Sequence, residues 1–67
     1  MQIFVNGKKI QLPVDGLSVM GLVVHMQLVG KRIAIERNGD ILPRSQFDQV
    51  FLRDGDKLEI VGAVGGG

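Results

Sequence analysis

Cysteine, tryptophan and tyrosine are absent from this sequence of 67 residues, which contains a single histidine. Without cysteine, a disulfide framework, a thiolate-bound zinc or iron–sulfur site and a cysteine nucleophile are excluded. The chain also has no marked excess of positive or negative charge, because eight Lys and Arg balance seven Asp and Glu for a net charge of +1. We therefore expect no binding to nucleic acid, which depends on a basic excess.

The sequence also has no apolar segment long enough to span a membrane. The longest apolar stretch, residues 19–29, is interrupted by Gly21, His25 and Gln27 and falls far short of the ~20 residues that span a bilayer. It does not follow a basic N-terminal region, so it does not have the pattern of a signal peptide. We expect a cytoplasmic protein that does not interact with membranes.

What is present fits one small folded domain. The hydrophobic fraction is 45% and the charged fraction 22%, close to the averages of globular proteins. A domain of about 60 residues has a thin core and little room for a deep ligand pocket. His25 is the single histidine, and without a second His or Cys it cannot form a conventional zinc site. We interpret it as a surface residue and expect no bound metal or cofactor.

The start of the chain has the pattern of a β-hairpin. Apolar and polar residues alternate over residues 1–5, except at Phe4, and again over residues 8–12, as in half-buried strands. Asn6-Gly7 between them predicts a type I′ turn, because both central residues of that turn need positive φ. We therefore expect two antiparallel strands here.

Residues 18–29 have the pattern of an amphipathic helix. Ser18 is expected to be its N-cap, and Gly30 is expected to occupy the C′ position that ends it. The apolar residues at i, i+3, i+4 and i+7 form one helix face, which consists of Val19, Leu22, Val23 and Met26. Gly21 costs about 1 kcal/mol relative to Ala inside a helix, but the segment is too long for a typical strand.

The second half of the chain predicts three more extended segments, which lie at residues 32–37, 41–42 and 57–61. Tight turns are predicted between them at Asn38-Gly39 and Asp54-Gly55-Asp56. We interpret the two aspartates as turn residues rather than as a catalytic carboxylate pair. Residues 45–50 are expected to form one irregular helical turn that directs Phe47 inward.

The resulting β-β-α-β-β order predicts an α+β domain in which one helix covers one face of a small mixed sheet. The first and last strands would lie side by side and parallel. The other sheet face would be open to water, and we expect Phe4, Ala34 and Val61 on it. We assign residues 1–61 to this domain and residues 62–67 to a flexible C-terminal tail rich in glycine.

Several segments resemble a known family. Residues 1–5 (MQIFV) are identical to the opening of ubiquitin, and residues 34–44 (AIERNGDILPR), 52–61 (LRDGDKLEIV) and 64–67 (VGGG) resemble the bacterial sulfur carrier of thiamine biosynthesis, the ThiS family. The resemblance runs from end to end and implies the ubiquitin-like β-grasp fold. The chain departs from the family on the helix, where family members often have Glu or Lys in place of Met20, Gly21 and Val24.

The resemblance implies a carrier protein and co-substrate rather than an enzyme. A ubiquitin-activating-like adenylyltransferase would use ATP to adenylate the terminal carboxylate of Gly67. Sulfur from a donor protein would then give a thiocarboxylate, which would donate its sulfur to thiazole synthase. Gly65 and Gly66, which lack Cβ, would thread through a narrow channel in the partner. The partner-binding patch would consist of Phe4, Ala34, Val61 and Val64.

Other functions remain open from the sequence. The sulfur-carrying subunit of molybdopterin synthase shares the fold and the Gly-Gly terminus, but its family is usually longer and lacks the element at residues 38–44. A ubiquitin-like protein modifier would be activated by the same first step. A plain interaction module would carry its glycines as an inert end. On the helix, Met20 and Val24 would either extend the partner contacts or mark a self-association surface.

Overall fold

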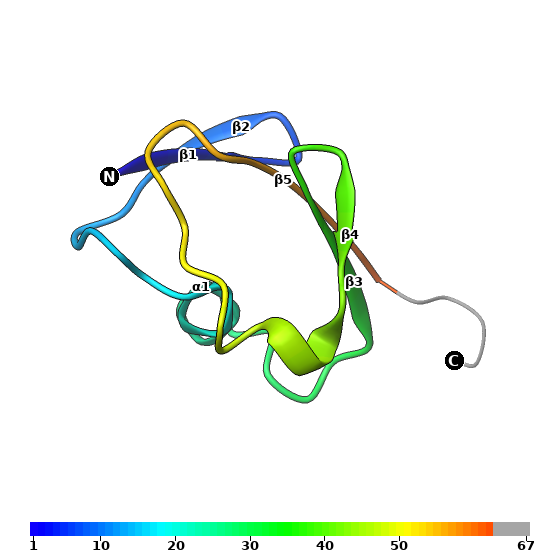
Figure 1. The fold of residues 1–67 in the computed structure, drawn as a ribbon. Helices are drawn as coiled ribbons and strands as arrows, with labels where there is room; N and C mark the ends of the chain where they lie inside the picture. Colours follow the sequence, from blue (N-terminus) through cyan, green and yellow to red (C-terminus); the bar gives the residue numbers. More distant parts are fainter. Residues whose placement is uncertain (63–67) are drawn as a thin grey trace.

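The computed structural model describes residues 1–62. Within them a five-stranded mixed sheet curves around one α-helix (Figure 1). The elements in chain order are β1 (Gln2–Val5), β2 (Lys8–Gln11), α1 (Val19–His25), β3 (Ile33–Arg37), β4 (Asp40–Leu42), the short 3-10 helix η1 (Arg44–Gln46) and β5 (Lys57–Gly62). The predicted α+β class is confirmed. The predicted β-β-α-β-β order is found with one further strand, because Asp40–Leu42 pairs with β3 as β4. Of the expected tail at residues 62–67, residues 63–67 lie outside the described residues.

β5 lies in the middle of the sheet, whose strand order is β2-β1-β5-β3-β4. It pairs parallel with β1, where Val5 is opposite Leu58, and antiparallel with β3, where Ile35 is opposite Ile60. The predicted parallel pairing of the first and last strands is therefore confirmed. β5 also extends one residue beyond the expected end, because Gly62 still pairs with Ile33. Gly62, which we expected to begin the tail, is thus part of the sheet.

The helix begins as predicted. The Ser18 hydroxyl accepts a hydrogen bond from the Gly21 N–H at 2.9 Å, which makes Ser18 the N-cap. A Cβ on residue 21 would clash with Leu17, because it would lie 2.5 Å from Leu17 Cδ1. The absence of a side chain at Gly21 therefore leaves room for the Leu17 side chain to pack against the first turn of the helix. The low helix propensity of Gly21 is therefore offset by this close approach.

The expectation that Gly30 ends the helix is wrong. The helix ends at His25, and Gln27 adopts the left-handed conformation with φ of 60°. The N–H groups of Gln27 and Leu28 donate to the carbonyls of Val24 and Val23, the pattern of a Schellman motif. This earlier end turns Leu28 back toward the core, against which it is partly buried. Gly30 has a φ of 82° but lies in the following turn.

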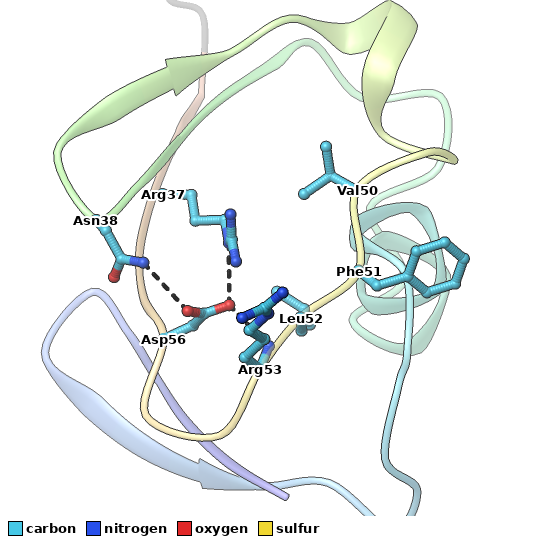
Figure 2. A pocket seen from close by; sticks show the side chains of 7 residues that line it. All are labelled: Arg37, Asn38, Val50, Phe51, Leu52, Arg53 and Asp56. Atoms are coloured by element: carbon cyan, nitrogen blue, oxygen red, sulfur yellow. Dashed lines mark hydrogen bonds and ion pairs between the residues drawn. The ribbon is translucent and has the colours of Figure 1, made fainter.

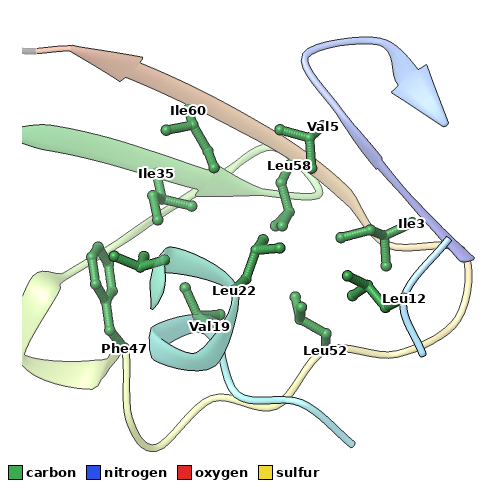
Figure 3. Close-up of a cluster of buried hydrophobic side chains, with 11 residues drawn as sticks. Ile3, Val5, Leu12, Val19, Leu22, Ile35, Phe47, Leu52, Leu58 and Ile60 are labelled. Atoms are coloured by element: carbon green, nitrogen blue, oxygen red, sulfur yellow. The ribbon is translucent and has the colours of Figure 1, made fainter. Parts of the chain in front are cut away.

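One hydrophobic core lies between α1 and the inner face of the sheet (Figure 3). Its buried residues come from every layer of the fold and are Ile3, Val5, Leu12, Val19, Leu22, Val23, Ile35, Phe47, Leu52, Leu58 and Ile60. Phe47, which follows η1, is only 2% exposed, so the prediction that it points inward is confirmed. His25 is exposed, as expected.

Candidate functional site

The candidate site is the end of the molecule where β5 leaves the sheet. Four of the expected site residues lie outside the described residues, and these are Val64, Gly65, Gly66 and Gly67. The structure describes their base, which is the exposed Gly62. Because Gly62 pairs with Ile33, the chain leaves the sheet at the end where β3 begins.

The open face of the sheet carries the other three expected partner-binding residues. Ala34 and Val61 lie directly opposite each other on β3 and β5, and both are exposed, Val61 at 57%. Phe4 is half-buried and pairs with Lys57. Residues 57 and 61 are about 13 Å apart along β5, at ~3.3 Å per residue. The fold therefore brings Ala34 and Val61 together and holds Phe4 apart from them.

Two carboxylates lie in the middle of this face, and the sequence reasoning missed them. Glu36 and Glu59 are exposed and directly opposite each other on β3 and β5. Like charges in such positions destabilise a sheet, and neither forms an ion pair within residues 1–62. Ile41, which is opposite Glu36 on β4, is 76% exposed. The surface next to Ala34 and Val61 is therefore both apolar and acidic.

The side chain of Asn6 holds the outgoing half of β5. Its Oδ1 accepts a hydrogen bond from the Ile60 N–H at 2.7 Å, and its Nδ2 donates to the Ile60 carbonyl at 3.0 Å. The Asn6 N–H also donates to the Leu58 carbonyl. The asparagine thus pairs with β5 as another residue of β1 would, while its own φ of 52° turns the chain into the hairpin.

A second asparagine holds the other end of β5. Asn38 Oδ1 accepts from the Lys57 N–H at 2.9 Å, and Asn38 Nδ2 donates to Asp56 Oδ1 at 3.1 Å. The Asn38 N–H also donates to the Lys57 carbonyl. Both predicted Asn-Gly turns are confirmed by their positive φ angles. In each of them the asparagine side chain also connects a hairpin tip to the central strand, which the sequence reasoning did not anticipate.

Asp56 is a buried carboxylate, 6% exposed, at the start of β5. Besides Asn38, it accepts hydrogen bonds from Arg37 Nε at 3.0 Å and from the Arg53 N–H at 2.8 Å (Figure 2). Burial alone would raise the pKa of Asp56, but these hydrogen bonds and the Arg37 charge outweigh it and lower the pKa below its usual value. The Asp56 carboxylate is therefore ionised and structural at neutral pH.

The two aspartates of the 54–56 turn serve the fold, as interpreted from the sequence. Asp54 Oδ1 accepts from the Gln2 N–H at 2.7 Å, and Asp56 has the three donors described above. A hollow opens beside Asp56, and Phe51 on its rim points away from it (Figure 2). Because the Asp56 carboxylate is already hydrogen-bonded to its neighbours, it is not free to act as an acid or base.

Residues 1–62 contain neither a metal-binding cluster nor a membrane-spanning helix. Among these residues, no group of three or more His, Asp or Glu side chains lies close enough to hold a metal ion. No helix formed by them is long and apolar enough to cross a membrane.

Comparison with known proteins bears on the whole chain. The model of the ThiS family matches residues 2–67. The sulfur carrier protein ThiS of Bacillus subtilis is 37% identical over 62 residues, which cover 92% of this chain and 94% of that protein. A thiazole synthase of Paramagnetospirillum magneticum is 37% identical over 67 residues. This chain spans only 20% of the length of that thiazole synthase, although all of the chain is matched.

A solved structure agrees with these sequence matches. The crystal structure of a thiamine biosynthesis protein (ThiS) from Geobacter metallireducens is similar to this fold with a TM-score of 0.88 at 32% identity, and the match covers 100% of both chains. The family model and the coverage of the Bacillus protein show that this chain belongs to the ThiS family and has its ubiquitin-like β-grasp fold.

Proposed function

We propose that this chain is the sulfur carrier of thiamine biosynthesis. The observation that supports this most directly is the ThiS family match over residues 2–67, which includes the C-terminal glycines. The match favours the thiamine pathway over the molybdopterin synthase subunit and over a protein modifier. A matching segment also makes up a fifth of a thiazole synthase chain, which supports joint action of the two proteins.

The proposed reactive group is the C-terminal carboxylate of Gly67. A carboxylate is a poor electrophile, so an adenylyltransferase partner uses ATP to form an acyl-adenylate and releases pyrophosphate. Sulfur delivered by a donor protein at the oxidation level of sulfide then attacks the acyl carbon. A C–S bond forms, AMP leaves, and the product is a thiocarboxylate, which thiazole synthase consumes. The partners supply the nucleotide site and the acid–base groups, and this chain supplies the acyl group without acting as an enzyme.

The chain's own contribution is reach and docking. Five fully extended residues span at most about 17 Å, at 3.3–3.6 Å per residue, which is the reach available beyond Gly62. Gly65 and Gly66 have no Cβ and fit a narrow channel. The expected patch supports docking at the base of this segment, because Ala34 and Val61 are exposed opposite each other next to Gly62.

Intact mass measurement tests the carrier function. The chain is incubated with the adenylyltransferase, ATP and a sulfur donor, and the expected gain is that of one oxygen replaced by sulfur. Deletion of Gly66 and Gly67 is expected to abolish this gain without changing the unfolding temperature, because both residues lie beyond the core elements. A wild-type chain with unchanged mass would refute the carrier function, and a ladder of protein conjugates would indicate a modifier.

A matched pair of variants tests the docking patch. Val61→Asp is expected to weaken binding to the adenylyltransferase in calorimetry, since it places a third carboxylate beside Glu36 and Glu59. Val14→Asp is the control, because Val14 is similarly exposed at 50% but lies in the loop after β2. Equal affinities for wild type and Val61→Asp would remove this patch from the proposal.

A further inference from the structure

A small apolar cavity lies close to the point where β5 leaves the sheet. It has a volume of ≈ 90 Å³ and lies between the end of α1, the loop after it and η1. Met20, Leu28, Val29, Ile33 and Phe47 supply its apolar wall, and Lys31 and Arg44 also line it. Because Ile33 pairs with Gly62, the cavity and the end of β5 belong to one surface.

Two cationic residues, Lys31 and Arg44, line this cavity. Arg44 Nη2 donates to the Lys31 carbonyl at 3.0 Å, which holds the Arg44 guanidinium beside the loop. Arg32 follows directly, and its carbonyl lies 4.0 Å from the position that a Cβ of residue 62 would take. All three cationic residues are exposed, and within residues 1–62 none of them forms an ion pair with a carboxylate.

The neighbouring surface exposes apolar side chains and has few charged residues. Residues 17–30 contain no Lys, Arg, Asp or Glu, although the chain as a whole is 22% charged. Val24 and Val29 on this surface are 58% and 64% exposed. An apolar cavity with cations on its rim is complementary to a segment that combines an apolar side chain with carboxylates.

We propose that this surface, which we call the exit pocket, docks an apolar and acidic segment of thiazole synthase beside its active-site entrance. This inference rests on the proposed function, because it takes thiazole synthase as the partner that receives the chain's C-terminus. An apolar side chain of the partner fills the cavity, and adjacent carboxylates pair with Lys31 and Arg44. The exit pocket lies outside the patch of Ala34 and Val61 and supplies the positive charge that the patch lacks.

Charge reversal at Lys31 tests the rim. Its main-chain carbonyl, not its side chain, contacts Arg44, so Lys31→Glu is expected to leave the urea unfolding curve unchanged. Its Kd for thiazole synthase is expected to rise about fivefold or more, because the variant loses one exposed ion pair and gains a repulsion between like charges. The difference is expected to shrink between about 0.05 M and about 0.5 M salt because the rim is exposed.

Two further variants complete the test. Val29→Ser is expected to weaken binding with little dependence on salt, because it removes an apolar contact. Lys8→Glu, the same charge change on the far strand β2, is expected to bind like wild type. Wild-type affinity for Lys31→Glu, or equal loss for Lys8→Glu, would overturn the exit pocket, as would a wild-type chain that does not bind thiazole synthase.

Sulfur loading distinguishes this inference from the function on which it rests. A wild-type chain that gains the sulfur mass while Lys31→Glu binds thiazole synthase normally would refute the exit pocket alone. A wild-type chain that never gains the mass would refute both.

Discussion

The hydrogen bonds of Asn6 predict a measurable loss of stability for Asn6→Gly. Residue 6 has a φ of 52°, which glycine adopts readily. The substitution therefore keeps the turn and removes only the two side-chain bonds to Ile60, of 2.7 and 3.0 Å. Both bonds are partly buried, so the Ile60 N–H and carbonyl lose partners in a region with restricted access to water.

The magnitude follows from these two bonds. Each contributes about 0.5–1.5 kcal/mol, and glycine also increases the entropy of the unfolded chain by roughly 0.4–1 kcal/mol. We expect the free energy of unfolding to fall by about 2 kcal/mol in total. For a domain of this size the unfolding temperature then falls by roughly 10 °C, at about 4–8 °C per kcal/mol.

Urea unfolding and amide exchange measure this effect. The Ile60 amide is expected to exchange faster in Asn6→Gly, because its acceptor is the Asn6 side chain. Gln27→Gly is the matched control, since Gln27 also has a positive φ of 60° and its side chain makes no hydrogen bond within residues 1–62. That control is expected to be neutral or stabilising by up to ~1 kcal/mol. If the two variants changed stability equally, the Asn6 side chain would not restrain β5.

Three other substitutions test the fold. The pKa of Asp56 is lower in the folded chain than in the unfolded chain. Its contribution to stability is therefore full above about pH 3.9 and is lost as the pH falls through the folded pKa. In urea titrations, Asp56→Asn is expected to be less stable than wild type at pH 7, and this difference is expected to shrink at acid pH. Gly21→Ala is expected not to gain the usual ~1 kcal/mol of helix propensity, because its Cβ meets Leu17. In a Leu17→Ala background this contact is absent, and Gly21→Ala is then expected to raise the unfolding temperature. Phe47→Ala is expected to destabilise by about 3–5 kcal/mol, since Phe47 is buried in a thin core, and a loss below 1 kcal/mol by urea titration would contradict that burial.

The strands and the start of the helix could be predicted from the sequence because their signals are local. Alternation over residues 1–5 and 57–61 reflects burial of every second side chain, and Ser18 caps a helix through a group three residues away. The end of the helix depends on tertiary packing instead. Gly30 is the better local C′ residue, but the chain turns at Gln27, and Leu28 then packs against the core.

The candidate site was less predictable, because its geometry depends on register between distant strands. The alternation of side chains along each strand places Ala34 and Val61 on the open face, but only the pairing of β3 with β5 shows that they are opposite each other. The parallel register of β1 and β5 separates Phe4 from them. Asn6-Gly7 likewise predicts a turn correctly, while the bonds from Asn6 to Ile60 span 54 residues and leave no local signal.

These contacts show where the pairing of β5 with its two neighbours ends. Alternate residues of β5 face β1, and the carbonyls of Asp56 and Leu58 accept from the N–H groups of Phe4 and Asn6. The next residue of β5 that faces this side is Ile60. Because β1 ends before it, the Ile60 N–H donates to the Asn6 side chain instead of to a backbone carbonyl of β1. Beyond it Val61 and Gly62 pair with β3 alone. Asn6 therefore marks the point at which two-sided pairing of β5 ends, so opening of β5 that starts at Gly62 is expected to stop there in the wild type and to spread further in Asn6→Gly.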